Sequence, residues 1–337
     1  MQGFSVAPLP FSEVEITAGM WQDRLETNRK VSIPFAFQKC KESGRIDNFS
    51  IAAGQENGDF RGKRYDDSEV YKVLEGAAYT LQTHPDPTLE RYLDSLIQLI
   101  AAAQEPDGYL FTTRTIKPDQ PADASPGRWS DLGRDHELYN AGHLYEAAVA
   151  HHQATGKTSF LEIAIKHANL VYEEFVVQER AGVPGHQEIE MGLIRLYTAT
   201  GEEKYLDLAH LFLERRGRQL PEEKSGINHQ RPVYSQQHLP VAQQNEAVGH
   251  AVRAGHQYIA MADIAGLKQD SSYRSALQAI WEDVVTGKQS ITGGVGASRA
   301  GESFAAAYQL PNALAHNETC AAIANMRWNY RMYLLHG

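Results

Sequence analysis

Residues 144–167 read LYEAAVAHHQATGKTSFLEIAIKH, which is the pattern of two helices joined by a tight turn. The apolar residues of the first half recur with the period of an amphipathic helix. Gly156 follows this run, and glycine is the residue that most readily adopts the left-handed conformation in which helices end. Phe160 then begins a second apolar-periodic run that continues through His167. The segment therefore predicts a helical hairpin.

The same hairpin recurs along the chain. Complete copies are expected at residues 70–103, 189–215 and 248–285, with turns at Pro85-Asp-Pro87, Gly201 and Gly266. A further copy is represented only by its first helix, residues 321–335. Closing a ring of hairpins takes about six units, so the pattern predicts an all-α, (α/α)6-type helical toroid that is incomplete at its C-terminus. We expect residues 70–337 to form this truncated barrel domain, and residues 1–69 to lead into it.

The composition limits the classes of partner. An apolar content of 42% suffices for a sizeable core, and a net charge of −10 argues against a nucleic-acid-binding protein, because phosphates would be repelled. No stretch approaches the roughly 18 apolar residues of a membrane span, and the start of the chain lacks a secretion signal. Its two cysteines, Cys40 and Cys320, do not suggest a disulfide framework. We expect a cytoplasmic protein without a membrane partner. The sequence does not indicate its oligomeric state.

Two carboxylates and one thiol lie close in sequence to a glycine-rich loop, residues 293–301. Glu302 follows this loop, and Glu318 and Cys320 come sixteen and eighteen residues later. A spacing of two lets a carboxylate oxygen and a thiolate sulfur reach one zinc ion, which leaves Glu302 for proton transfer. In the alternative interpretation, Cys320 is a buried small hydrophobe and both glutamates are solvated surface residues.

The glycine loop itself suggests a phosphate-binding loop, but two features argue against that interpretation. No Lys-Ser/Thr pair follows the last glycine, and no parallel-strand pattern precedes the loop. We expect the glycines instead to let the backbone pass close to a ligand and to direct Glu302 inward.

Segments along nearly the whole chain resemble, in order, the β-L-arabinofuranosidase family of glycoside hydrolases. They are Ile46-Asp-Asn-Phe, Ala52-Ala-Gly, His136-Glu-Leu-Tyr-Asn-Ala-Gly-His, Gly185-His-Gln-Glu-Ile-Glu, Gly249-His-Ala-Val-Arg, the run from Ile291 to Phe304, Tyr308-Gln-Leu-Pro-Asn and Asn317-Glu-Thr-Cys-Ala. The resemblance implies a retaining glycosidase with Glu302 as acid/base. It also implies a zinc ion held by Glu318, Cys320 and two adjacent cysteines further along, one of them the nucleophile. This chain has no adjacent cysteine pair, so the nucleophile is expected beyond residue 337, as is the family's β-sandwich domain.

Three histidines occupy equivalent places in the repeat. His143, His186 and His250 lie at or just before the first helix of three hairpins, so we expect them near one rim of the toroid. A lone histidine there would more often be a cap or a core residue, but the equivalence of three favours hydrogen bonds to sugar hydroxyls. The resemblance likewise implies that they contact arabinose. A three-histidine metal site is the other interpretation, although their wide separation gives no ligand pattern.

The expected function is removal of non-reducing-end β-L-arabinofuranosyl residues from small-molecule or oligosaccharide arabinofuranosides. The sequence does not identify the leaving group of the substrate. The 337-residue chain alone is expected to be nearly inactive.

Two alternative functions stay open. A sugar epimerase or isomerase on the same helical fold could use histidines as acid and base, and a non-catalytic carbohydrate-binding or scaffold protein would need no nucleophile.

Overall fold

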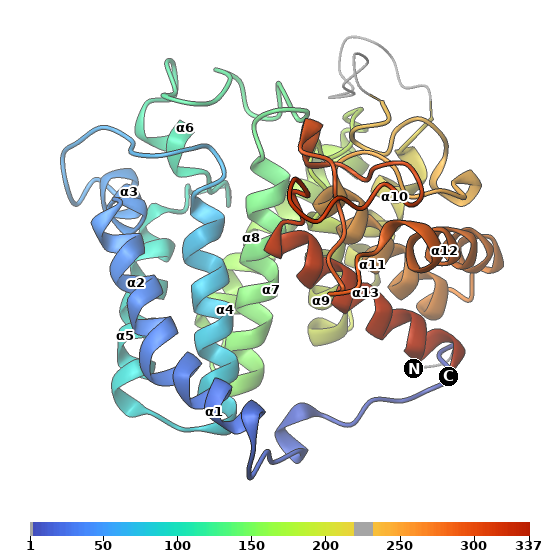
Figure 1. Ribbon diagram of the computed structural model, residues 1–337. Helices are drawn as coiled ribbons and strands as arrows, with labels where there is room; N and C mark the ends of the chain where they lie inside the picture. Colours follow the sequence, from blue (N-terminus) through green and yellow to red (C-terminus); the bar gives the residue numbers. More distant parts are fainter. Residues whose placement is uncertain (1–2, 219–231) are drawn as a thin grey trace. The chain divides into compact units, whose positions relative to one another are not determined.

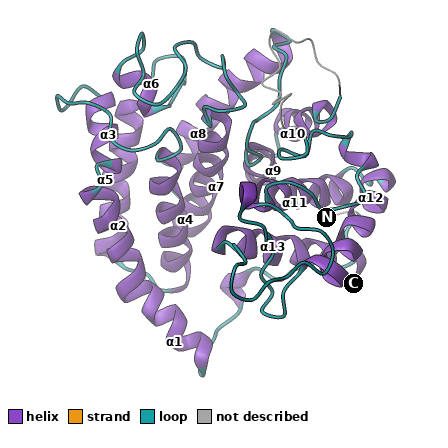
Figure 2. Cartoon of the chain, turned by 45° about the horizontal axis from the view of Figure 1, so that its top comes forward, coloured by secondary structure: helices purple, strands orange, loops and turns teal. Residues whose placement is uncertain are grey.

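The computed structural model describes residues 3–218 and 232–337, with the side chain of Ser12 left out. Within these ranges it contains helices and loops and no β-strand (Figures 1 and 2). The prediction of an all-α fold of the (α/α) type is confirmed. None of the described helices is long and apolar enough to cross a membrane.

The chain divides into two compact units. The C-terminal unit comprises residues 181–194, residues 206–337 and the described part of residues 1–8, and the N-terminal unit comprises residues 9–180 and 195–205. The N-terminal unit runs across the expected boundary between residues 69 and 70, and that boundary stays a prediction.

The N-terminal unit is built from helical hairpins. Its α-helices are α1 (Met20–Thr27), α2 (Ile33–Glu42), α3 (Arg45–Ala52), α4 (Asp67–Thr83), α5 (Pro87–Ala103), α6 (Thr112–Ile116), α7 (Glu137–Thr155) and α8 (Ser159–Tyr172). Helix α4 packs against α7, and α7 packs against α8 (Figure 1). The turn between α4 and α5 ends where the Asp86 carboxylate accepts the N–H groups of Thr88 and Leu89, at 2.9 and 3.1 Å. Such a side-chain cap satisfies backbone donors that the helix itself leaves without a partner.

Two aromatic residues fill the core of this unit. Tyr109 and Trp129 are almost completely buried, and their rings meet edge to face at 5.4 Å. The Glu137 carboxylate accepts from the Tyr109 hydroxyl at 2.5 Å and from the Trp129 backbone N–H at 3.0 Å. Burial raises the pKa of Glu137 to about 7. Both aromatic residues therefore serve the packing of the core.

The C-terminal unit contains α11 (Ala251–Leu267), α12 (Ser271–Asp283) and α13 (Thr319–His336), with α11 packed against both of the others. It also holds the first half of α9 (Ile189–Thr200) and most of α10 (Glu203–Arg215). Contact between α11 and α13 is close at Gly255, where a Cβ atom would come within 2.6 Å of the Ala324 methyl. This packing needs a residue without a side chain.

One predicted turn is displaced. Gly266 was expected to end its helix as Gly156 and Gly201 end theirs, each with φ 73°, but Gly266 lies inside α11. A Cβ atom at Gly266 would collide with the Phe4 ring, 2.2 Å away, so this glycine makes room for an aromatic side chain. The left-handed residue of this turn is Gln269, with φ 55°.

Candidate active site

The loop between α12 and α13 holds Glu302 in an unusual backbone conformation. Both Gly301 (φ 69°) and Glu302 (φ 52°) have left-handed backbone conformations, which residues other than glycine rarely adopt. Ser298 and Ser303 exchange two backbone hydrogen bonds of 3.0 Å across this turn, which keeps it closed. Strain that the surroundings enforce in this way is typical of functional positions.

The glycine loop serves the site through its backbone. Gly296 passes so close to α11 that a Cβ atom would lie 2.7 Å from the Ala251 methyl. Its carbonyl accepts from the Asn317 N–H at 3.1 Å, and the neighbouring Ala297 carbonyl accepts from the His316 N–H at 3.0 Å. The loop therefore joins the start of α11 to the residues that lead into α13.

His250 lies directly against the acid/base candidate. It is the N-cap residue of α11, where its Nδ1 accepts the backbone N–H of Arg253 at 3.2 Å. Its Nε2 lies 3.0 Å from Oε2 of Glu302, whose side chain is half exposed. Burial, aided by the Arg253 cation and opposed by the Glu302 carboxylate, lowers the pKa of His250 to about 4. The imidazole is therefore neutral near neutral pH.

Glu318 completes a three-residue cluster with this pair. The ligand-type atoms of His250, Glu302 and Glu318 all lie within 4.8 Å of one another. His316, which the sequence analysis did not single out, also faces the two carboxylates. Its Nε2 lies 3.9 Å from Oε1 of Glu302 and 3.7 Å from Oε2 of Glu318. Its position two residues before Glu318, directly before the segment Asn317-Glu-Thr-Cys-Ala that resembles the family, was the available signal.

Cys320 lies in the first turn of α13, next to Glu318 at the N-cap, and is exposed. The alternative that Cys320 is a buried small hydrophobe is therefore wrong. Carboxylate oxygen and thiolate sulfur are both ligands that Zn²⁺ accepts, but a closed zinc site takes four. The Glu318 carboxylate and the Cys320 thiolate are ligand types that fit zinc, and by number they would make up half of such a site.

His186 and His250, two members of the predicted trio, lie side by side. Their ring centroids are 5.6 Å apart, and the His256 ring lies at the same distance from the His186 ring. His256 was missed by the sequence analysis. Its Nδ1 lies 2.8 Å from Oε2 of Glu188, which is completely buried and belongs to the same sequence segment as His186.

Two buried arginines hold the loop that carries His186. Arg216, completely buried, donates to the Pro184 carbonyl at 2.8 Å, and Arg253 donates to the Gly185 carbonyl. Burial lowers the pKa of Arg216 to about 10, although the Glu190 carboxylate 3.6 Å away opposes that shift. Guanidinium groups that bind carbonyl oxygens in this way fix the backbone just before His186.

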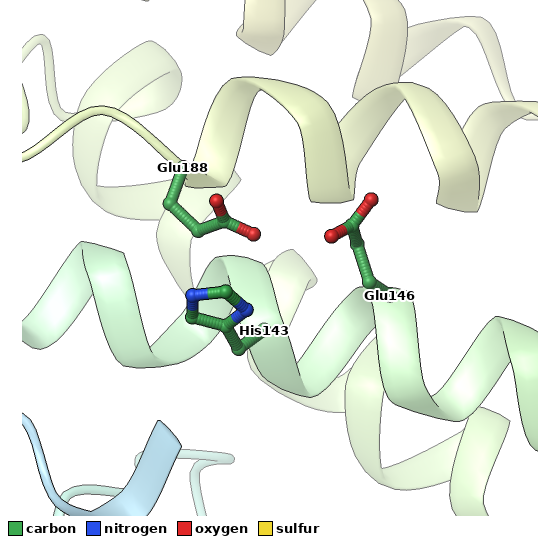
Figure 3. A group of neighbouring side chains, drawn as sticks. All are labelled: His143, Glu146 and Glu188. Carbon is green, nitrogen blue, oxygen red and sulfur yellow. The ribbon is translucent and has the colours of Figure 1, made fainter. Parts of the chain in front are cut away.

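His143 belongs to the N-terminal unit, so its convergence with His186 and His250 stays a prediction. It is buried on α7, where its ring meets Tyr139 edge to face at 4.7 Å. Glu146, one turn further along α7, is also buried and lies on the same side of the helix (Figure 3). The pair places a base and a carboxylate on one helix face, as residues three apart are placed.

A carboxylate on a strained loop beside a neutral histidine, on an (α/α) fold, is an arrangement that suits acid/base chemistry on a glycoside. The family model of the β-L-arabinofuranosidase GH127 catalytic domain matches residues 13–337. The chain therefore belongs to the GH127 β-L-arabinofuranosidase family.

Individual relatives agree with this assignment. A non-reducing end β-L-arabinofuranosidase of Bifidobacterium longum subsp. longum is 39% identical over an alignment of 297 residues that covers 84% of this chain and 45% of the relative. Two solved structures superpose closely. A GH127 β-arabinofuranosidase has a TM-score of 0.91 at 48% identity over 99% of this chain and 52% of its own. A GH127 β-L-arabinofuranosidase of Geobacillus stearothermophilus T6 has a TM-score of 0.89 at 41% identity over 96% of this chain and 53% of its own. The chain thus spans about half the length of these relatives.

Proposed function

We propose that the protein containing this chain removes non-reducing-end β-L-arabinofuranosyl residues from glycosides, with retention of configuration. The observation that carries the proposal is the pairing of Glu302 with His250 in the C-terminal unit. A relative that is 39% identical is named for this activity. The substrate class is therefore a small-molecule or oligosaccharide arabinofuranoside.

Glu302 acts in both steps of the proposed reaction. In the first step its carboxylic acid protonates the glycosidic oxygen as the bond to the anomeric carbon breaks, so that the leaving group departs as an alcohol. In the second step its carboxylate takes a proton from the water that attacks the anomeric carbon, while the bond between that carbon and the nucleophile formed in the first step breaks and the nucleophile departs. His186, buried next to His250, and His256, buried next to His186, offer imidazole groups that can bind sugar hydroxyls.

The nucleophile and the metal follow from the family resemblance. We propose a cysteine thiolate nucleophile that residues 1–337 do not contain, and a zinc ion for which Glu318 and Cys320 supply two ligands. Zinc, when bound, keeps cysteine thiols ionised near neutral pH. The two ligands present rarely suffice to hold zinc tightly, so the 337-residue chain is proposed to be nearly inactive by itself.

The direct test is product analysis with an aryl β-L-arabinofuranoside and with a natural arabinofuranoside. The catalytically active protein should release L-arabinose as the β-anomer first, which nuclear magnetic resonance resolves before mutarotation. Initial release of the α-anomer would contradict retention. Formation of an isomerised sugar without cleavage would instead indicate an epimerase or isomerase.

A further inference from the structure

The His250 side chain is engaged at both of its ring nitrogens. Nδ1 accepts the backbone N–H of Arg253 in the first turn of α11. A backbone N–H can only donate, so Nδ1 carries no proton. The single proton of the neutral ring is then on Nε2, which lies 3.0 Å from Oε2 of Glu302.

We propose that the N-cap of α11 selects the Nε2–H tautomer of His250 and thereby makes His250 the positioning residue of Glu302. This inference rests on the proposed role of Glu302 as acid/base. It assigns His250 a task that binding of a sugar hydroxyl does not require. Second-neighbour hydrogen bonds of this kind commonly determine which histidine nitrogen carries the proton.

The orientation of the carboxyl group follows from this contact. Oε2 accepts the imidazole N–H, so in the acid form the proton is carried on Oε1. Oε1 is therefore the atom that delivers the proton to the leaving oxygen. A carboxyl group that is half exposed would otherwise rotate freely, and His250 removes that freedom.

His250 is itself held firmly enough for this task. Its backbone N–H donates to the Tyr234 carbonyl at 3.0 Å, and its ring meets the Tyr234 ring edge to face at 5.5 Å. The backbone around it is joined to that after Glu302, since Phe304 N–H donates to the Gly249 carbonyl at 2.9 Å. These contacts hold the ring where Nδ1 accepts the Arg253 N–H and Nε2 faces Glu302.

Two substitutions separate the two contacts of the ring. In His250→Asn the amide oxygen occupies the place of Nδ1 and can cap α11, but the side chain is too short to reach Glu302. In His250→Gln the amide nitrogen occupies the place of Nε2 and can donate to Glu302, whereas glutamine is a poor N-cap residue. The first variant preserves the helix cap, and the second preserves the contact with the carboxyl group.

The catalytically active protein should show opposite orders of stability and of turnover. We expect His250→Asn to melt within about 2 °C of the original protein and His250→Gln to melt a few degrees lower. For a natural glycoside, we expect kcat to fall roughly 100-fold in His250→Asn but only roughly tenfold in His250→Gln. An aryl glycoside with a good leaving group should lose less in both variants. If His250→Gln is as slow as His250→Asn, or if both variants raise only KM and do so equally for both substrates, the positioning role is wrong.

A spectroscopic measurement tests the tautomer without any activity. In the 337-residue chain with ¹⁵N-labelled histidine, the His250 signals, assigned by their loss in His250→Asn, should show a protonated Nε2 and an unprotonated Nδ1 at pH 7. They should do so in Glu302→Gln as well, because the cap remains. A protonated Nδ1 would overturn the inference. If Glu302→Gln of the catalytically active protein stays fully active while the tautomer is as expected, the proposed function fails and the tautomer assignment survives.

Discussion

The hydroxyl oxygen of Tyr145 lies 2.8 Å from Nδ1 of His167, and both residues are completely buried between α7 and α8. Burial lowers the pKa of His167 from 6.5 to about 4 and raises that of Tyr145 well above 10. The contact is therefore a hydrogen bond between two neutral groups, in a place where a charge would be costly.

A pH dependence of stability follows from His167. The folded-state pKa lies below the unfolded value, so the unfolded chain binds the proton more tightly. The contribution of His167 to the free energy of unfolding is therefore fully present above pH 6.5 and is lost as the pH falls toward 4. At 1.36 kcal/mol for each pKa unit, the loss is about 3 kcal/mol. Urea unfolding at several pH values should show it, and His167→Gln, which keeps a hydrogen-bonding side chain but does not titrate, should flatten the slope. An equally steep slope in that variant would assign the effect to other groups.

The Glu302 carboxyl is expected to carry the proton transfers. In the catalytically active protein, Glu302→Gln should lower kcat on natural glycosides by about two to four orders of magnitude, because the amide cannot donate or accept the proton. The first step on an aryl glycoside with a good leaving group should suffer less. Glu282→Gln, at an exposed position on α12, is the matched control and should leave kcat unchanged. A mild loss in Glu302→Gln that is equal for both substrates would mean that Glu302 has another task.

Zinc content should depend on Cys320. If Glu318 and Cys320 are half of a four-ligand site, the catalytically active protein should contain about one zinc ion per chain and Cys320→Ser should lose most of it. Cys40→Ser is the matched control, because Cys40 is buried on α2 and belongs to no candidate site. Metal analysis of the 337-residue chain should find little zinc. Stoichiometric zinc that resists a chelator in this chain would contradict the assignment of only two ligands to it.

The histidine trio should act on catalysis more than on folding. Replacing His143 or His186 by alanine should cost roughly 1–3 kcal/mol of transition-state stabilisation, the scale of one lost buried polar contact, with little change in melting temperature. The ratio kcat/KM on an arabinofuranoside measures this cost. An experimental structure with a bound sugar should place His143 on the same cavity as His186 and His250. If the variants melt at a much lower temperature while the specific activity of the folded protein stays unchanged, these histidines have a structural role instead.

The repeated hairpins could be predicted from the sequence because helix periodicity and turn chemistry depend on residues that are close in sequence. The hairpin predicted at residues 189–215 with its turn at Gly201 corresponds to α9 and α10, and the residues predicted from 321 to 335 lie within α13. The capping residues that end these helices act within one turn of the chain, so their effect can be read from neighbouring letters. Gly266 shows the limit of this approach, because the ring of Phe4, more than 250 residues away in sequence, determines why a glycine stands there.

The features of the candidate site likewise divide into those that sequence could predict and those that depend on the fold. Glu302, Glu318 and Cys320 were named from sequence, since carboxylates and a thiol at short spacing have recognisable chemistry, and the family segments around them added support. The tautomer of His250, the inclusion of His256 with Glu188, and the position of His316 between two carboxylates depend on tertiary contacts. Which nitrogen carries a proton, and which charge is buried, are set by groups that folding brings within hydrogen-bonding distance, and no local pattern encodes that distance.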